Sequence, residues 1–237
     1  MRIVVLTGAG ISAESGLKTF RDGGGLWESY AIEEVATPEA FHANPELVLN
    51  FYNERRKQLF DKGIKPNAAH FALAELQKQY PGQVTLITQN VDNLHERAGA
   101  TKVIHMHGEL LKMRCEQCGN VSLQEKDISL EDQCTKCLQR KCLRPHIVWF
   151  GETPLALADI QVSLHSCDVF LSIGTSGSVY PAALLVKMAK DLSNAYTVEI
   201  NTNPTENGHF FDKHLQGSAS ELVPKFIEQL IQDKFYE

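Results

Sequence analysis

The sequence predicts an α/β protein with a doubly wound, Rossmann-like parallel sheet and a small zinc-binding insert. Short apolar runs alternate with helical patterns along most of the chain, as expected where crossover helices join the strands of a parallel sheet. A glycine-rich segment follows the first apolar run. Five of the six cysteines gather between residues 113 and 144, where the hydrophobic periodicity fades. The first two observations predict the sheet, and the third predicts the insert.

Five strands are expected. Three of the runs are short and apolar and end at Gly, Asn or Thr, which is typical of buried strands in a doubly wound sheet. In chain order, the expected strands are Ile3–Leu6, Val84–Thr88, Val103–Met106, Asp168–Ile173 and Ala195–Ile200.

Capping residues and residue spacing indicate the helices. Asn44-Pro45, a cap followed by a first-turn proline, opens a helix that extends to about Asp61. Pro66-Asn67 opens another helix. The apolar residues expected to line one face of this helix are Phe71, Leu73 and Leu76. Two further helices are expected over Pro181–Leu192 and Ala219–Ile231.

This pattern predicts two units. Residues 1–112 and 145–237 would form the Rossmann-like, dinucleotide-binding domain, with a helical part around residues 30–80. Residues 113–144 would form the zinc-binding module. A module of that size cannot bury much core of its own, so it needs a metal or another cross-link to be stable.

Composition excludes several classes of protein. With 43% hydrophobic and 22% charged residues, the chain of 237 residues is not largely disordered. Its net charge of −6 disfavours nonspecific nucleic-acid binding, which needs Lys and Arg against phosphates. No apolar run approaches the roughly 18–20 residues of a membrane span. We therefore expect a cytoplasmic monomer without nucleic-acid or membrane partners.

Two Cys-x-x-Cys pairs stand in the cysteine-rich segment, separated by residues 119–133. Two such pairs at this separation can clasp one tetrahedral zinc ion. The expected ligands are Cys115, Cys118, Cys134 and Cys137. Four thiolates leave no position for a catalytic water, so one structural zinc ion is predicted. Redox dithiols or free thiols are the alternative, and Cys142 could replace Cys137. Cys167 is expected to be a buried core thiol.

A loop of small residues, Gly8–Gly16, follows the first strand. Such a loop allows a backbone to approach a pyrophosphate. The spacing is not G-x-G-x-x-G, however, so a tight turn that uses glycine only for packing is the alternative. Polar or small residues also follow two other strands, at Gly174–Ser178 and Asn201–Asn203. Ligands of open α/β sheets bind outside the carboxyl ends of strands, so three such loops favour a dinucleotide.

Several motifs then follow in a specific order. They are Gly8-Ala9-Gly10-Ile11-Ser12 with Ser15-Gly16, Phe20-Arg21-Asp22, Thr88-Gln89-Asn90-Val91-Asp92-Asn93-Leu94-His95, His107-Gly108-Glu109, Arg144–Glu152 and Gly174-Thr175-Ser176. Together they resemble the sirtuins, which are NAD-dependent protein-lysine deacylases. The cysteine pairs lie between the His-Gly-Glu and Phe-Gly-Glu motifs, where the family has them. The resemblance covers nearly the whole chain.

The resemblance implies that NAD is consumed as a cosubstrate, that zinc is structural, and that the substrates are acylated lysine side chains of proteins. The products would be nicotinamide, free lysine and O-acyl-ADP-ribose. His107 would be the general base, with Asn90 as its catalytic partner. His105 lacks the following Gly-Glu and is the weaker candidate for the base. The cofactor-binding residues implied are Gly8, Ala9, Gly10, Ser12, Phe20, Arg21, Trp27, Gln89, Asn90, Asp92, Gly174, Thr175, Ser176, Asn201 and Ala219. A strand-to-helix cap is the alternative for residues 89–95.

Tyr52 and Arg55 are three residues apart on an expected helix and share a face. A phenol and a guanidinium can bind an acyl chain that ends in a carboxylate. A solvated amphipathic helix is the alternative. A Tyr-x-x-Arg pair here resembles the bacterial class III sirtuins, which implies removal of succinyl and malonyl as well as acetyl groups. An extended peptide would lie between residues 177–180 and a second segment. The substrate-binding residues expected in that segment are Val148, Phe150, Gly151 and Glu152.

Three other functions fit parts of the sequence. Transfer of ADP-ribose to a protein would use the same NAD site. A noncatalytic sensor of NAD or ADP-ribose would need no base, so the presence of His107 with Asn90 and Asp92 argues against it. A nucleic-acid-binding zinc ribbon would use cations near the cysteines, which we expect to be a solvated face. These cations are Lys112, Arg114, Lys136, Arg140, Lys141 and Arg144.

Overall fold

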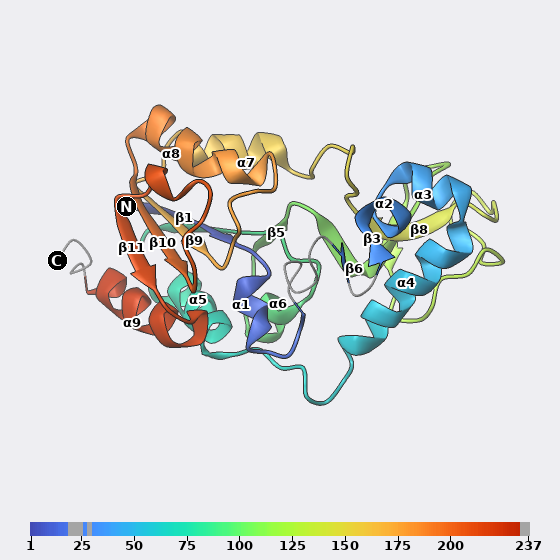
Figure 1. Cartoon of the computed structure of the whole chain (residues 1–237), viewed down its shortest axis with the longest axis horizontal. Helices are drawn as coiled ribbons and strands as arrows, with labels where there is room; N and C mark the ends of the chain where they lie inside the picture. Colours follow the sequence, from blue (N-terminus) through green and yellow to red (C-terminus); the bar gives the residue numbers. More distant parts are fainter. Residues whose placement is uncertain (19–25, 28–29, 233–237) are drawn as a thin grey trace.

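The structure is a computed structural model that describes residues 1–18, 26–27 and 30–232. Two lobes lie side by side in it (Figure 1). We call them the sheet lobe, which holds a parallel sheet and the helices around it, and the small lobe, which is built from residues 26–64 and 108–149 as far as they are described.

A six-stranded, all-parallel sheet organises the sheet lobe, in the order β5-β4-β1-β9-β10-β11. Counted among these six strands alone, the order is 3-2-1-4-5-6, which is that of the Rossmann fold. The strands are β1 (Arg2–Thr7), β4 (Gln83–Thr88), β5 (Val103–His105), β9 (Val169–Ile173), β10 (Tyr196–Asn201) and β11 (Lys213–Gln216). The predicted doubly wound fold is confirmed. Strand order reverses between β1 and β9, where a ligand crevice is expected.

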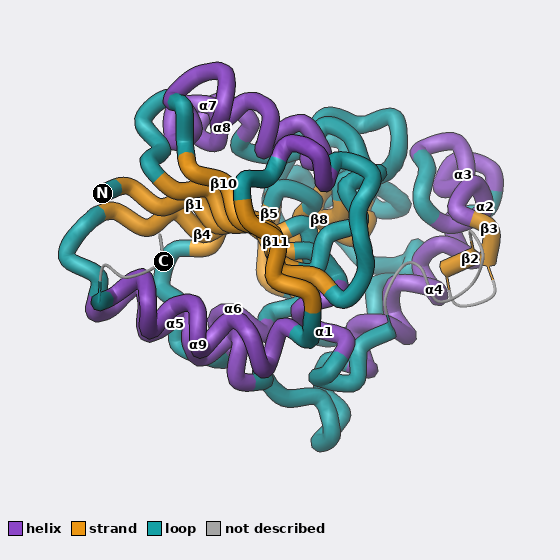
Figure 2. Tube along the Cα trace, turned by 60° about the vertical axis from the view of Figure 1, so that its left-hand side comes forward, coloured by secondary structure: helices purple, strands orange, loops and turns teal. Residues whose placement is uncertain are grey.

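Helices cover both faces of this sheet (Figure 2). One face carries α1 (Gly10–Ala13), α5 (Ala68–Gln79), α6 (Leu94–Arg97) and α9 (Ala219–Ile231), and the other carries α7 (Leu157–Leu164) and α8 (Leu185–Ser193). The alternation of β1 explains why both faces need a cover. Ile3 and Val5 pack with α5 and α9, whereas Val4 and Leu6 pack with α7 and α8.

The five predicted strands match to within two residues, but the edge strand β11 was not predicted. Its sequence, Lys-His-Leu-Gln, is polar and only half covered, so it lacks the apolar signal of a buried strand. The prediction for α5 was wrong at Phe71, which is 52% exposed, whereas Leu73 is 1% exposed. Residues two apart on a helix point to nearly opposite sides, so these two cannot share one face.

The small lobe combines two stretches of chain that are far apart in sequence. Its first stretch holds β2 (Leu26–Trp27), β3 (Tyr30–Ala31), α2 (Ile32–Val35), α3 (Pro38–Ala43) and α4 (Pro45–Gln58). Its second holds an antiparallel sheet, β7-β6-β8, made of β6 (Gly108–Cys115), β7 (Val121–Leu123) and β8 (Leu143–Ile147). This sheet extends beyond residues 113–144 on both sides, and the division of the chain into two units stays a prediction.

One hydrophobic core joins both stretches of the small lobe. Leu49 and Phe51 of α4 belong to the same cluster as Cys115, Leu143 and Trp149. The cysteine-bearing segment therefore buries its apolar residues against α4 instead of in a core of its own.

Among the helices of the described ranges, none is long and apolar enough to cross a membrane. The remaining short elements are the 3-10 turns Ala182–Leu184 and Gly208–Phe210.

Candidate functional site

The loop after β1 meets the loop after β9 at the point where strand order reverses. The N–H of Gly8 donates to Ile173 O at 3.0 Å, and the N–H of Gly10 donates to Gly174 O at 2.9 Å. A Cβ on Gly10 would lie 2.7 Å from Gly174 Cα, so only glycine fits this contact. The amides of Gly8 and Gly10 are thus engaged within the chain, and the approach of this loop to a pyrophosphate stays a prediction. The expected helix after the loop is also only four residues long.

Ser12 connects two predicted cofactor residues beside this contact. Asn90 Nδ2 donates to Ser12 Oγ at 3.2 Å and also lies 3.1 Å from Gly8 O. Ser12 Oγ donates to Asp92 Oδ2 at 3.1 Å. Ser12, Asn90 and Asp92 are all less than 8% exposed. The motif after β4 is therefore bonded to the loop after β1, across neighbouring parallel strands.

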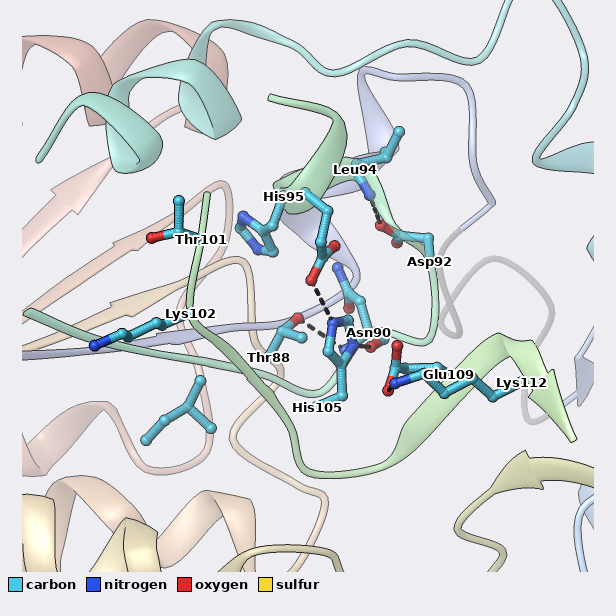
Figure 3. A network of polar contacts seen from close by, with 12 residues as sticks. Thr88, Asn90, Asp92, Leu94, His95, Thr101, Lys102, His105, Glu109 and Lys112 are labelled. Atoms are coloured by element: carbon cyan, nitrogen blue, oxygen red, sulfur yellow. Dashed lines mark hydrogen bonds and ion pairs between the residues drawn. The ribbon is translucent and has the colours of Figure 1, made fainter. Parts of the chain in front are cut away.

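Burial and two hydrogen bonds determine the pKa of the Asp92 carboxyl. Leu94 N donates to its Oδ1 at 3.0 Å (Figure 3). Burial raises the pKa of this carboxyl, and the hydrogen bonds from Leu94 and Ser12 oppose that rise. The bond to Leu94 also caps the start of α6, so the structural alternative for residues 89–95 holds at Asp92. The same side chain nevertheless presents a second oxygen to Ser12.

His107 lies between β5 and β6 and is half-buried. Its Nδ1 lies 3.2 Å from Gln89 O. A carbonyl oxygen can only accept, so Nδ1 carries the proton and a neutral ring has its lone pair on Nε2. Burial lowers the pKa of His107, and the bond to Gln89 opposes this only in part. The ring is therefore neutral near pH 7, as a general base requires.

Gly108 holds the backbone after His107. Its φ is +86°, and a Cβ there would lie 2.0 Å from His146 O. The N–H of Val148 donates to His107 O at 2.9 Å. The Gly of the His-Gly-Glu motif thus has a local structural cause, because the turn needs a left-handed residue packed against the chain near β8.

His105 has a different environment from His107. Its Nε2 lies 2.8 Å from Glu96 Oε1, and its Nδ1 lies 3.3 Å from Asn90 O (Figure 3). Burial alone would lower the pKa of His105, but the hydrogen bond and charge of Glu96 outweigh burial and raise it. With both ring nitrogens engaged, His105 supports the backbone of Asn90 and is a poor base. This agrees with the expectation from sequence that His105 is a weaker candidate for the general base than His107.

Two further buried histidines were not singled out from the sequence. The rings of His70 and His95 lie 5.0 Å apart, centroid to centroid. His95 Nε2 is 3.0 Å from Thr7 Oγ1, and His70 Nε2 is 3.4 Å from Ser12 Oγ. Burial lowers the pKa of His70 to about 4 and that of His95 to about 3. Their place in α5 and α6, which pack under the loop after β1, could not be read from local sequence.

Four cysteine sulfurs meet in the small lobe. The Sγ atoms of Cys115, Cys118, Cys134 and Cys137 all lie within 4.8 Å of one another. The pairs Cys115–Cys137 and Cys118–Cys134 are each separated by 3.7 Å. A zinc ion with four Zn–S bonds of about 2.3 Å sets its sulfurs about 3.8 Å apart, so the cluster fits a zinc tetrathiolate. The predicted ligand set is confirmed as a group that can hold the ion.

Of the two spare cysteines, Cys142 lies beside the cluster and Cys167 lies in the core of the sheet lobe. Cys142 Sγ is 3.4 Å from Cys115 Sγ but does not belong to the group of four. It interacts with both Cys115 and Cys137, and its replacement of Cys137 as a ligand stays a prediction. Cys167 is 1% exposed among apolar residues of the core over α7 and α8, which confirms its prediction as a core thiol.

Tyr52 and Arg55 are both buried in the small lobe, on α4. Trp149 Nε1 donates to Tyr52 Oη at 2.9 Å, and burial raises the pKa of the phenol well above its ordinary value. The Arg55 guanidinium carbon lies 3.3 Å from the centroid of the Phe51 ring, and Nη1 donates to Phe51 O at 2.7 Å. The alternative, a helix with a solvated Arg and a partly buried Tyr, is therefore wrong for Arg55, and Tyr52 is more deeply buried than it supposed.

Glu152 holds the turn that follows β8. Arg144 Nη1 donates to its Oε1 at 2.8 Å, and Arg144 Nη2 and Trp149 N donate to its Oε2 at 2.9 and 2.8 Å. Burial would raise the pKa of Glu152, but the bonds from Arg144 and Trp149 outweigh it and lower the pKa. Because Arg144 is only 1% exposed, the expectation that it belongs to a solvated basic face is wrong.

The other predicted peptide-binding residues lie on this same turn. The N–H of Val148 is bonded to His107 O, and that of Phe150 donates to Ala36 O at 2.9 Å. Phe150 is 45% exposed, and Gly151 has a φ of +88°. The segment is thus a surface turn that stands between β8 and α7, and its first amides are already used within the chain.

Four of the remaining predicted cofactor residues, Gly174, Thr175, Ser176 and Asn201, lie at the carboxyl ends of β9 and β10. Asn201 Nδ2 donates to Thr175 O at 2.6 Å, which joins these two loops. Asn201 also lines a cleft with Asn203 and Thr205. Ser176 follows in the β9 loop, and Ala219 is the buried first residue of α9. Phe20 and Arg21 lie outside the described residues, as does the side chain of Trp27.

This geometry defines a Rossmann-type α/β protein with a buried polar network between the loops after β1 and β4 and a cluster of four cysteines in a second lobe. The Sir2 family model matches residues 8–181, and the chain belongs to that family.

Relatives with known names or structures agree with this family. An NAD-dependent protein deacylase of Pasteurella multocida is 57% identical over 231 residues, which is 98% of each chain. The NAD-dependent protein deacylase of Escherichia coli K12 is 55% identical over 97% of this chain and 82% of its own. A crystal structure of a Sir2 homolog–NAD complex has a TM-score of 0.87 at 40% identity, and covers 98% of this chain and 90% of its own.

Proposed function

We propose that this protein removes acetyl, succinyl and malonyl groups from protein lysines in an NAD-dependent reaction that yields nicotinamide, free lysine and O-acyl-ADP-ribose. The observation that carries the proposal is that the segment after β4 holds both parts of the site: Gln89 O binds neutral His107, and the next residue, Asn90, bonds to Ser12, which in turn bonds to Asp92. Relatives that are 55–57% identical over nearly the whole chain are named NAD-dependent protein deacylases. The compartment expected from the sequence, the cytoplasm, and the monomeric state are part of the same proposal.

NAD, when bound, supplies a ribose carbon whose bond to nicotinamide breaks while the acyl oxygen of the substrate lysine bonds to that carbon. His107 accepts a proton from a ribose hydroxyl through Nε2, because Nδ1 is committed to Gln89 O. Ser12, Asn90 and Asp92 would bind the nicotinamide end and hold it in one orientation. Thr175, Ser176, Asn201 and Ala219 would line the adenosine end.

The acyl group would enter the small lobe toward Tyr52 and Arg55. Both side chains are buried together with Phe51 and Trp149, so a cation and a phenol stand in apolar surroundings. A carboxylate bound there would gain more from a guanidinium than it would in water. An acetyl group has no carboxylate, so it would gain nothing from Arg55.

The peptide would lie against the exposed turn that holds Phe150 and Gly151. Glu152 would act by keeping this turn in place through Arg144. A solved Sir2 structure with a TM-score of 0.73 and 34% identity carries a myristoylated histone peptide, which supports an acylated protein segment as the substrate class.

One assay tests these proposals. The protein is incubated with NAD and with one peptide that carries either acetyl-lysine or succinyl-lysine, and nicotinamide release and peptide mass are measured. Loss of the acyl mass with matching nicotinamide release is expected for both peptides. A gain of the mass of ADP-ribose on the protein or peptide would instead indicate ADP-ribosyl transfer, and binding of NAD without nicotinamide release would indicate a sensor.

Arg55→Met separates acyl recognition from catalysis. Loss of the guanidinium should lower kcat/KM for the succinyl peptide by about a hundredfold, since a charge-assisted pair is worth roughly 1.5–3 kcal/mol. The acetyl peptide should be affected far less. Equal losses on both peptides would disprove the role of Arg55. The matched control is Lys57→Met, which removes a cation two residues further along α4, on its exposed side.

A further inference from the structure

The helix that carries Tyr52 and Arg55 is held by a second pair of polar side chains. Asn53 and Arg56 each follow one of the pocket residues by one position, so the two pairs form adjacent stripes on α4. Asn53 is 5% exposed and Arg56 is 1% exposed. Neither residue belongs to the motifs that define the cofactor site.

Asn53 binds one residue of the cysteine-bearing segment twice. Its Nδ2 donates to Ile128 O at 2.9 Å, and its Oδ1 accepts from Ile128 N at 2.9 Å. Ile128 itself is 1% exposed and lies in the core shared with α4. This two-way pairing fixes both the distance and the rotation of α4 relative to the loop between the two cysteine pairs.

Arg56 extends the connection to the catalytic segment. Its Nη1 donates to Asn53 Oδ1 at 2.6 Å, and its Nε donates to Leu110 O at 2.9 Å. Leu110 lies three residues after His107, and its N–H donates to Val91 O at 2.8 Å. Asn53 and Arg56 therefore bridge α4, the loop at Ile128 and the segment that begins at His107.

This bridge is costly to bury. Desolvation lowers the pKa of Arg56 to about 10, and only the charge of Asp127 opposes it. Apolar residues of similar size would stabilise such an interior at least as well, whereas polar groups bond in one register only. The arrangement is suited to fixing a position more than to adding stability.

We propose that Asn53 and Arg56 are positioning residues for acyl selectivity: by binding Ile128 and Leu110 they hold α4 in the rotation that presents Tyr52 and Arg55 to the acyl group. This inference rests on the proposed role of Arg55. The loop between the zinc ligands then helps to set acyl preference without touching the substrate.

The chain offers a matched control for this inference. Lys57 Nζ binds Asp127 Oδ2 at 2.8 Å, which joins the same helix to the same loop, but both side chains are more than half exposed. An exposed pair contributes little and does not fix a rotation. Lys57→Ala should therefore leave acyl preference unchanged.

The test measures kcat and KM for matched succinyl and acetyl peptides in the full-length, zinc-containing protein. Asn53→Ala should raise KM for the succinyl peptide roughly tenfold while values for the acetyl peptide stay within about twofold, because misplacing a binding group costs about that much. Asn53→Asp keeps the oxygen that accepts from Ile128 and Arg56, so it should restore part of the preference. Zinc content per chain should stay at that of the unchanged protein in each variant.

Arg56→Lys is measured in parallel, because it keeps the positive charge but loses the planar set of donors. If Asn53→Ala does not fold, Arg56→Lys provides the test in its place. Equal loss on both peptides in these variants would overturn the inference and leave a structural role only. If Arg55→Met changes the preference and the bridge variants do not, only the bridge fails. If Arg55→Met also leaves the preference unchanged, the acyl-pocket proposal fails, and the bridge inference fails with it.

Discussion

At the scale of single residues, the protonation state of His107 decides whether the site can act as a base. Its Nδ1 is tied to a backbone carbonyl and its pKa lies below the ordinary value because the ring is partly buried. A base of lowered pKa stays neutral further into the acid range. The site is thus prepared for proton transfer at neutral pH by burial and by one hydrogen bond.

The pH profile follows from this pKa. Activity requires the neutral ring, so kcat/KM should be flat near pH 7 and fall only as pH drops through a midpoint below about 6.5. His107→Gln should lower kcat by roughly 10²–10⁴-fold and remove this acid limb. Initial rates of nicotinamide release between pH 5 and 8 provide the measurement. An acid limb centred above 6.5, or one that persists in the variant, would contradict the assignment.

The neighbouring pair His70–His95 makes the fold sensitive to acid. Both pKa values are lowered, to about 4 and about 3, whereas an unfolded histidine titrates near 6.5. Below that pH the unfolded chain binds protons that the folded chain does not, so the free energy of unfolding falls as pH falls.

Urea unfolding at pH 7 and pH 5 measures this effect. We expect a loss on the order of 1–2 kcal/mol per histidine between these two pH values. The loss should be smaller in His95→Gln, even if that variant starts from a lower stability. The same loss in both proteins would show that other groups carry the acid sensitivity.

The residues of the cofactor site were predictable to different degrees. Asn90, Asp92 and His107 stand at or near strand ends, and parallel strands bring those ends to one edge. The bond between Trp149 and Tyr52 joins residues 97 positions apart, and only tertiary packing brings them together. The bonds from the amides of Gly8 and Gly10 to Ile173 O and Gly174 O were not predicted, because sequence does not show which carbonyl lies opposite each amide.

At the scale of elements, burial follows the helical period and not the hydrophobicity of a residue alone. In α5, Leu73 faces the sheet core while Phe71 faces solvent. Leu73→Ala should therefore cost about 2–5 kcal/mol of unfolding free energy, and Phe71→Ala less than about 0.5 kcal/mol. Thermal or urea unfolding of the two variants compares them directly. Similar losses would mean that Phe71 is packed as the sequence pattern suggested.

The elements of the small lobe show where local signals end. Asn44 accepts from Leu47 N at 3.1 Å with Pro45 in the first turn of α4, so this start was readable from two residues. The antiparallel strands β6, β7 and β8 were not predicted, because none has a long apolar run: β6 and β8 mix apolar with charged residues, and β7 is three residues long with none of them buried. Their order depends on α4, which lies far away in the sequence.

The cysteine cluster belongs to this scale as well. Because Cys142 contacts Cys115 and lies outside the group of four, Cys142→Ser should keep about one zinc ion per chain, whereas Cys137→Ser should lose most of it. Metal analysis of the purified variants gives the answer. If zinc is retained in Cys137→Ser but lost when Cys137→Ser and Cys142→Ser are combined, Cys142 does replace Cys137 as a ligand.

At the scale of the whole molecule, the two lobes meet along the segments that carry the proposed chemistry. His107 lies between β5, the last strand on one edge of the parallel sheet, and β6, which begins the antiparallel sheet of the small lobe at Gly108. The proposed base therefore lies at the junction of the two lobes. The nicotinamide end of NAD is expected on one side and the acyl-lysine on the other. Each lobe would therefore bind one substrate, and the two substrates would meet at the junction where His107 lies.

The central place of β1 has a consequence for synthesis on the ribosome. This strand is synthesised before both of its neighbours in the sheet, β4 at residues 83–88 and β9 at residues 169–173. Its four consecutive apolar residues, Ile3 to Leu6, have to wait until residue 173 of 237 has emerged before both edges are paired. During translation β1 is therefore an unpaired apolar strand until β9 has been synthesised, and in that interval we expect it to be a target for chaperone binding.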